Sequence, residues 1–331
     1  MDSIRVGTIC RADAPAKINL FLEVLGKRSD GFHEIETLIG AISLRDTLYF
    51  REDPEGLVRV NCSWASGMEA GYTARSEEGR PSIAAGLGSL PDPADNTVAR
   101  ALDQFRRLAG ISSGATVRIV KRIPAAAGLG GASSDAAAAL SLANAVWKVG
   151  WEHQRLVELA ADIGSDVPFF LGPASALGRD GGMALCRGRG ERIDAVPVAN
   201  RLHLVVVRPP SGLLTADVYA ACQPAGDPVS AGPILAALRI GNIREAGRHL
   251  FNRLEPAAAR LSPWIQRLQA VFQRLDLLGF QMSGSGSSFF GICRHRRHAR
   301  RAAGLLRAAS IGQVFATSSV PQRCGISAVS T

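Results

Sequence analysis

The chain has 331 residues, of which 47% are hydrophobic and 20% charged, a composition that excludes a disordered polypeptide. No apolar run approaches the roughly 18 residues of a membrane span, and residues 1–5 lack the apolar core of a signal peptide. We therefore expect a cytoplasmic protein without a membrane partner. The net charge of +9 suits either nucleic acid or a small polyanionic substrate. The six cysteines contain no C-x-x-C pair, which argues against a disulfide framework or a zinc site.

The first hundred residues predict strands followed by a loop and a helix. Alternating polarity predicts four strands, at residues 6–11, 18–24, 34–43 and 47–50. Residues 61–93 are rich in glycine and serine and predict a long loop. Asp95 or Asn96 then provides an N-cap, and the apolar spacing that follows predicts a helix ending near Leu108.

A glycine-rich segment at residues 124–134 follows a predicted strand at 116–123 and precedes an alanine-rich helix at 135–148. Its glycines let the backbone approach a ligand, and the helix start offers free N–H groups and a positive dipole end. Together with the hydroxyls of Ser133 and Ser134, this suits a polyphosphate. The alternative is a plain turn in which one of these serines is the N-cap, because the spacing matches neither familiar nucleotide-binding motif.

The second half of the chain predicts alternating helices and strands. The expected features, in chain order, are a helix at 152–163 closed by Gly164, a domain boundary near the Gly/Arg-rich segment 187–190, a strand at 202–207, and a second glycine-rich stretch at 282–288 between a helix and a strand. The basic cluster 294–301 predicts the solvated first turns of a helix. A nucleic-acid surface is the alternative, although few aromatic residues lie nearby for base stacking. Cys293, His295 and His298 only superficially resemble metal ligands.

Several segments together resemble the GHMP kinase superfamily, which includes galactokinase, homoserine kinase and mevalonate kinase. Three carry the resemblance, in order along the chain: Ala14–Leu20, residues 124–134 and Met282–Ile292. Two others, Lys17–His33 and Gly164–Phe170, resemble the member that phosphorylates a hydroxyl of a cytidyl diphosphate sugar alcohol. The chain departs from the usual pattern at Phe32, Ala132 and Arg253, none of which belongs to the expected catalytic pair.

The resemblance implies an α+β fold of two domains with the active site in the cleft between them. Residues 1–190 would form an ATP-binding domain of the ribosomal protein S5 domain 2-like type. Residues 191–331 would form a ferredoxin-like α/β sandwich. The resemblance also implies ATP as phosphoryl donor and Mg²⁺ held by the ATP phosphates, with the hydroxyl of Ser133 or Ser134 as a further ligand. The expected phosphate-binding residues are Pro124, Ala125, Ala126, Ala127, Gly128, Leu129, Gly130, Gly131, Ala132, Ser133 and Ser134.

The resemblance assigns catalysis to Lys17 and Asp166. A tertiary hydroxyl is a weak acid, so a carboxylate within hydrogen-bond reach would help to remove its proton. Lys17 would pair with this carboxylate and with the acceptor oxygen, keeping the carboxylate ionised. From the residues alone, Asp166 before Val167-Pro168 is a helix N-cap, and Lys17 is a lysine of an edge strand.

The resemblance also implies a cytosine pocket. The base would lie between the rings of Phe32 and Tyr219, with His33 reading its edge. Asn19 faces the same way as Lys17 in a strand and would bind the acceptor or a phosphate, with an ordinary buried amide as the alternative. The expected partner is therefore a small molecule and not a nucleic acid. Another GHMP kinase, of the homoserine or mevalonate type, is the nearest alternative, and the sequence leaves the oligomeric state open.

Overall fold

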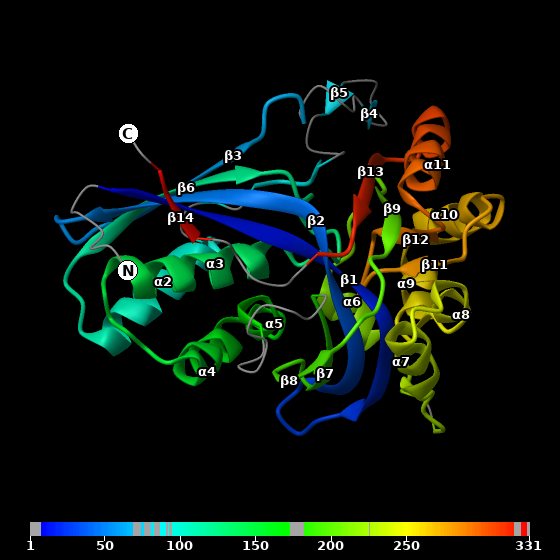
Figure 1. Ribbon diagram of the computed structural model, residues 1–331, viewed down its shortest axis with the longest axis horizontal. Helices are drawn as coiled ribbons and strands as arrows, with labels where there is room; N and C mark the ends of the chain where they lie inside the picture. The colour runs from blue at the N-terminus through cyan, green and yellow to red at the C-terminus, as the bar shows by residue number, and fades with distance from the viewer. Residues whose placement is uncertain are drawn as a thin grey trace.

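The larger of two main sheets has eight strands and extends from the left of the view in Figure 1 past its centre. The computed structural model describes residues 8–68, 74–75, 81–82, 87–90, 92, 95–172, 182–224, 226–320 and 326–329. The sheet's main order is β10-β1-β2-β6-β3, with β14 beside β1, β7 beside β2 and β8 beside β7. Its strands are β1 (Ile9–Lys27), β2 (His33–Asp53), β3 (Val58–Trp64), β6 (Gly114–Lys121), β7 (Met183–Gly188), β8 (Arg192–Val196), β10 (Phe251–Asn252) and β14 (Ile326–Val329).

Strands β1 and β2 are much longer than the sequence predicts, at 19 and 21 residues. The breaks expected between short strands are wrong, because register shifts at Pro15/Ala16, Asn19/Phe21 and Val24/Gly26 let the antiparallel pair continue. Such bulges tolerate a proline or an inward polar residue without ending the strand, so a polarity pattern alone predicts a break. The long β1 carries the polar residues of its middle deep into the protein.

Helices α2 (Thr97–Ala109), α3 (Gly131–Val146), α4 (His153–Ile163) and α5 (Val167–Leu171) lie on one side of this sheet (Figure 1). The predicted helix after Asn96 is confirmed, since the Asn96 side chain accepts the Val98 N–H. Helix α3 begins four residues before the predicted start, directly after Gly130. Ser133 and Ser134 therefore lie within its first turn, and the alternative that one of them is the N-cap is wrong.

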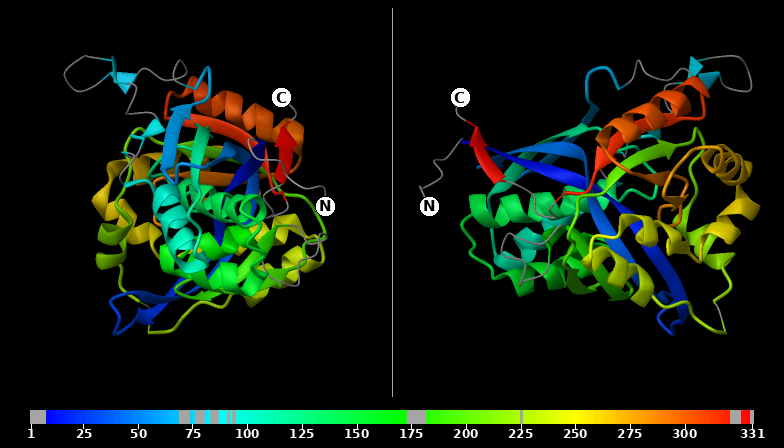
Figure 2. Two further views of the ribbon diagram at one scale, coloured as in Figure 1. Left: turned by 90° about the vertical axis from the view of Figure 1, so that its left-hand side faces the viewer. Right: turned by 45° about the vertical axis from the view of Figure 1, so that its right-hand side comes forward.

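The smaller sheet has the order β11-β12-β9-β13 and is antiparallel throughout. Its strands are β9 (His203–Arg208), β11 (Gly279–Met282), β12 (Phe289–Cys293) and β13 (Gln313–Ser318). Its helices are α6 (Thr215–Ala220), α7 (Gly232–Arg239), α8 (Ile243–Arg248), α9 (Glu255–Leu261), α10 (Pro263–Gln273) and α11 (Arg296–Ala308). The second glycine-rich stretch joins strands β11 and β12, so its predicted place between a helix and a strand is wrong. Helix α11 confirms the helix predicted from the basic cluster and packs on β9, β12 and β13 (Figure 2).

The segment predicted as a long loop at 61–93 begins later than expected, because β3 continues to Trp64. Two short paired strands, β4 (Ala74–Arg75) and β5 (Pro81–Ser82), lie within it. Most of the remaining positions lie outside the described residues. Within the described part of the chain, no helix is both long and apolar enough to cross a membrane.

Backbone pairing and charge tie the second half of the chain to strand β1. Strand β10 pairs in parallel with β1, at Phe21 and Phe251. Next to it, the Arg253 guanidinium donates two hydrogen bonds, of 2.7 and 2.8 Å, to the buried carboxylate of Glu23. Arg253, which departs from the family pattern, thus forms an ion pair with the buried carboxylate of Glu23. Such a pair is strongly destabilising to break, since the remaining charge stays buried.

Candidate active site

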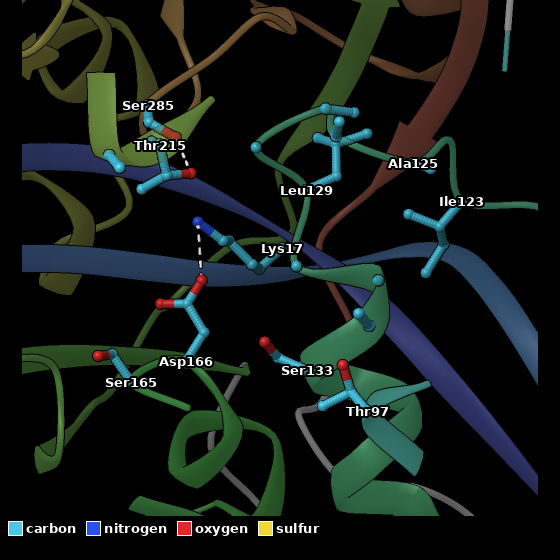
Figure 3. A pocket seen from close by; sticks show the side chains of 18 of the residues that line it. Lys17, Thr97, Ile123, Ala125, Leu129, Ser133, Ser165, Asp166, Thr215 and Ser285 are labelled. Atoms are coloured by element: carbon cyan, nitrogen blue, oxygen red, sulfur yellow. Dashed lines mark hydrogen bonds and ion pairs between the residues drawn. The ribbon is translucent and has the colours of Figure 1, made fainter. Parts of the chain in front are cut away.

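A cavity of about 950 Å³ lies where the two sheets meet. The glycine-rich segment 124–134 borders it, and Figure 3 shows side chains from both halves of the chain pointing into it. The structure brings these predicted site residues to its walls: Lys17, Asn19, Phe32, His33, Pro124, Ala125, Ala126, Ala127, Gly128, Leu129, Gly130, Gly131, Ala132, Ser133, Asp166 and Tyr219. Ser134, by contrast, is fully buried and does not line the cavity.

The glycine-rich loop is held from both sides. The Lys17 N–H donates to the Leu129 carbonyl at 2.9 Å. The second glycine-rich stretch supplies the opposite anchors, since the Ser283 hydroxyl donates to the Gly128 carbonyl at 3.0 Å and the Ser288 N–H to the Ala127 carbonyl at 3.2 Å. With its carbonyls engaged in this way, the loop leads into the free N–H groups at the start of α3, which favour an anionic ligand.

Gly130 is required by conformation and by space. Its φ of +70° is the left-handed region that side chains disfavour. A Cβ at this position would lie 2.9 Å from both the Lys17 Cγ and the Phe170 Cζ. The glycine thus lets the glycine-rich loop pass directly over the lysine side chain.

Lys17 and Asp166 point toward each other across the cavity (Figure 3), with 3.4 Å between Nζ and Oδ2. Lys17 is buried in β1, whereas the Asp166 side chain is 36% exposed and accessible to a substrate. Asp166 occupies the N-cap position of α5, but its side chain makes no capping hydrogen bond. The carboxylate is therefore directed at the lysine and the cavity instead of the helix backbone.

Asn19 holds the lysine in place. Its Oδ1 accepts a hydrogen bond of 2.7 Å from the Lys17 Nζ, and its Nδ2 donates to the Thr37 hydroxyl at 2.9 Å. Thr37 in turn donates to the Phe21 carbonyl. Both polar groups of the amide are engaged, so the geometry supports a positioning role; a direct contact between Asn19 and the substrate stays a prediction.

Aromatic side chains gather at one end of the cavity. His33 and Tyr219 have ring centroids 5.0 Å apart, and Phe32, at the adjoining hairpin tip, is 47% exposed. Burial, together with the positive charge of Lys27, lowers the pKa of His33, so its ring is neutral at pH 7. A neutral imidazole offers one donor and one acceptor to the edge of a base.

A buried charge cluster that the sequence did not predict lies beside the glycine-rich loop. The Lys121 ammonium bonds to the carboxylates of Asp46 and Asp135, the latter at 2.6 Å, and all three side chains are almost completely buried. Lys121 and Asp135 both line the cavity. In the sequence, only the position of Asp135 directly after Ser134 pointed to this cluster. An aspartate at the start of a predicted helix is ordinarily explained by its favourable interaction with the positive end of the helix dipole.

Other residues at the cavity were also missed because their partners are distant in sequence. The hydroxyls of Thr215 and Ser285 lie 2.9 Å apart at its wall. Cys62, Asn96 and Val98, from β3 and the start of α2, also line the cavity. Within the described residues, no three His, Cys, Asp or Glu side chains could form a metal cluster.

A glycine-rich loop facing a lysine–aspartate pair across one cavity is typical of enzymes that transfer a phosphoryl group to a small molecule. The families described as GHMP kinases N terminal domain and GHMP kinases C terminal match residues 96–172 and 234–309. A 4-diphosphocytidyl-2-C-methyl-D-erythritol kinase of Pelotomaculum thermopropionicum is 38% identical over 301 residues, which cover 90% of this chain and 94% of that protein. The kinase of the same name from Rhodopirellula baltica is 38% identical over 311 residues, with 88% and 89% covered. The chain belongs to the GHMP kinase family.

Solved structures agree with this assignment. The crystal structure of a 4-(cytidine 5'-diphospho)-2C-methyl-D-erythritol kinase superposes with a TM-score of 0.70 at 34% identity, covering 94% of this chain and 99% of that one. A homoserine kinase from Cytophaga hutchinsonii has a TM-score of 0.66 at 20% identity, with 99% of both chains covered, and so shares the fold. The predicted two-domain fold is confirmed. The division at residue 190 stays a prediction; β8 still belongs to the larger sheet, and β9 is the first strand of the smaller one.

The buried cluster generates a pH-dependent prediction. Burial and the nearby negative charge of Asp46 raise the pKa of Asp135 to about 7. The positive charge of Lys121 offsets this rise only in part. The folded protein therefore holds a proton that an unfolded aspartate releases near pH 4, and its free energy of unfolding falls through this window by up to about 1.4 kcal/mol per pH unit. An Asp135→Asn variant has no titrating carboxyl at this position and therefore lacks this pH dependence of the free energy of unfolding. Urea unfolding of both proteins should show the wild type losing stability relative to the variant from about pH 5 to pH 7; parallel curves would contradict the assignment.

Proposed function

We propose that the protein transfers the γ-phosphoryl group of ATP to the 2-hydroxyl of 4-diphosphocytidyl-2-C-methyl-D-erythritol, giving the 2-phosphate and ADP. This step belongs to the non-mevalonate, or methylerythritol phosphate, isoprenoid pathway of the cytoplasm. One observation carries the proposal: the Lys17–Asp166 pair faces the glycine-rich loop within the same cavity that ends in Phe32, His33 and Tyr219. Relatives with this named activity align over about nine-tenths of the chain.

ATP binds with its phosphates along the 124–134 loop. The N–H groups at the start of α3 and the positive end of its dipole stabilise the phosphate oxygens. The adenine ring then occupies the part of the cavity lined by Cys62, Asn96 and Val98, which leaves the aromatic rings to the acceptor. This orientation directs the γ-phosphate toward Lys17 and Asp166.

Asp166 accepts the proton of the acceptor hydroxyl as that oxygen approaches phosphorus. Its carboxylate is partly exposed and makes no capping bond, so it is free to hydrogen bond with the substrate. Lys17 neutralises charge beside the reacting oxygens, and its position is fixed by Asn19. The protein thus contributes mainly positioning and electrostatic stabilisation, which is what phosphoryl transfer needs.

Magnesium fits the donors present. When bound, Mg²⁺ neutralises phosphate charge, and it needs only one or two protein ligands because it keeps most of its waters. Ser133, whose side chain lines the cavity, and Asp135 are the oxygen donors nearest the phosphate loop. The Asp135 Oδ1 is buried and has no hydrogen-bond partner among the described residues, so an oxygen remains available.

A panel of acceptors tests the proposal directly. ADP release should be measured with the cytidyl substrate, homoserine, mevalonate and galactose at equal concentrations. A pocket that hydrogen bonds the edge of a base should favour the cytidyl substrate by about 1,000-fold or more in kcat/KM. Faster turnover of homoserine or mevalonate would reassign the chain to another branch of its family.

The catalytic base is tested by Asp166→Asn, which keeps the shape of the side chain but removes its basic oxygen. We expect kcat to fall about 100-fold or more, with nucleotide affinity and melting temperature nearly unchanged. Asp162→Asn is the matched control, because this exposed aspartate of α4 does not line the cavity. If the Asp166 variant retained more than about a third of wild-type turnover, a role as base would be untenable.

The cytosine pocket is tested by Tyr219→Ala, which removes one stacking face. The KM for the cytidyl substrate should rise about 5- to 150-fold, while the KM for ATP stays nearly constant because ATP occupies the other side of the cavity. Phe32→Ala should act in the same way, and Phe32→Tyr, which keeps the ring face, should be nearly silent. Steady-state kinetics with each substrate varied in turn would reveal a misplaced pocket as a change in the KM for ATP.

A further inference from the structure

The turn between β7 and β8 lies against the catalytic segment. The Arg189 N–H donates to the Glu191 carboxylate at 2.6 Å, which fixes the turn. Gly190 follows with a φ of +119°, and a Cβ on it would lie 3.1 Å from the Ser165 carbonyl oxygen. The backbone beside Arg189 is therefore packed against the residue that precedes Asp166.

The side chain of Arg189 extends away from the catalytic segment and reaches the Phe32 ring. Its guanidinium carbon lies 4.7 Å from the centroid of the Phe32 ring, and the residue lines the main cavity. A guanidinium at this distance over a ring face is a cation–π contact, which restrains the orientation of the ring. Arg189 thus spans the interval between the aromatic end of the cavity and the catalytic aspartate.

The charge of Arg189 is less neutralised than that of its neighbours. Arg187 pairs with Glu36 and Asp194, and Arg192 pairs with Glu34. Among the described residues, no carboxylate lies within 4.0 Å of the Arg189 guanidinium, and the exposed Asp30 carboxylate interacts with it only through Coulombic attraction. Lys27, a second cation, lines the same end of the cavity. A guanidinium in a cavity whose N–H donors are not engaged by a close ion pair is suited to a bidentate contact with a phosphate.

We propose that Arg189 determines specificity for the cytidyl substrate: it stacks on one face of Phe32, leaving the other face for the base, and binds the diphosphate. The inference rests on the proposed function and goes beyond it by naming the group that reads the anionic part of the substrate. The diphosphate joins the cytidine to the sugar alcohol. Since the base lies at Phe32 and the reacting hydroxyl at Asp166, the diphosphate lies between them, beside the turn that carries Arg189.

Arg189→Gln tests the proposal, with Arg192→Gln as a control that loses the same charge from the same hairpin but does not line the cavity. The first variant should raise the KM for the cytidyl substrate about 10-fold or more, with kcat and the KM for ATP within about twofold of wild type. Calorimetry should show affinity for cytidine diphosphate falling about 10-fold and affinity for cytidine less than threefold. Arg189→Lys should recover part of the diphosphate affinity. The control should remain within about twofold throughout.

Three results would overturn the proposal. An unchanged KM would show that Arg189 makes no contact with the substrate, and a lowered KM would show that it occupies the position of the base. Equal losses for cytidine and cytidine diphosphate would show that it acts only through Phe32. If the wild-type enzyme failed to phosphorylate the cytidyl substrate, the proposed function would fall, but the comparison of the two nucleotide ligands would still decide the role of Arg189.

Discussion

Burial of the Lys17 ammonium is the constraint on which the rest of the site depends. An ammonium removed from water is tolerated only with compensating partners, and here these are the Asn19 amide and the Asp166 carboxylate. The backbone N–H of the same residue anchors the phosphate loop through Leu129. One position in β1 therefore fixes the loop, the lysine and the carboxylate relative to one another, which is the pre-organisation that phosphoryl transfer requires.

The second half of the chain completes this arrangement. Asn252 donates to the carbonyls of Met282 and Gly284, holding the second glycine-rich stretch, which in turn anchors the phosphate loop through Ser283. Both glycine-rich segments are thus parts of one structure, in which the first borders the cavity and the second supports the first. The ion pair of Glu23 and Arg253 and the pairing of β10 with β1 tie this half of the chain to strand β1, which carries Lys17.

The sequence predicted those parts of the protein that rest on local signals or on the family resemblance. The helix after Asn96 followed from its cap, and the fold followed from the order of the motifs. The long β1–β2 pair did not, since its bulges depend on the partner strand. Lys121 illustrates the same limit: its partners Asp46 and Asp135 are 75 and 14 residues away, and only the folded sheet brings the three together. Arg189 was overlooked because its ring contact is also a tertiary feature.

A ternary complex with a non-hydrolysable ATP analogue and the cytidyl substrate would test the central claim most directly. A crystal structure of it should show the phosphates along the 124–134 loop, the acceptor hydroxyl within about 3.2 Å of an Asp166 carboxylate oxygen, and the cytosine beside His33. The Lys17–Asp166 contact should persist in the complex. An acceptor hydroxyl bound away from Asp166, or an ATP base in the pocket of Phe32 and Tyr219, would contradict the account.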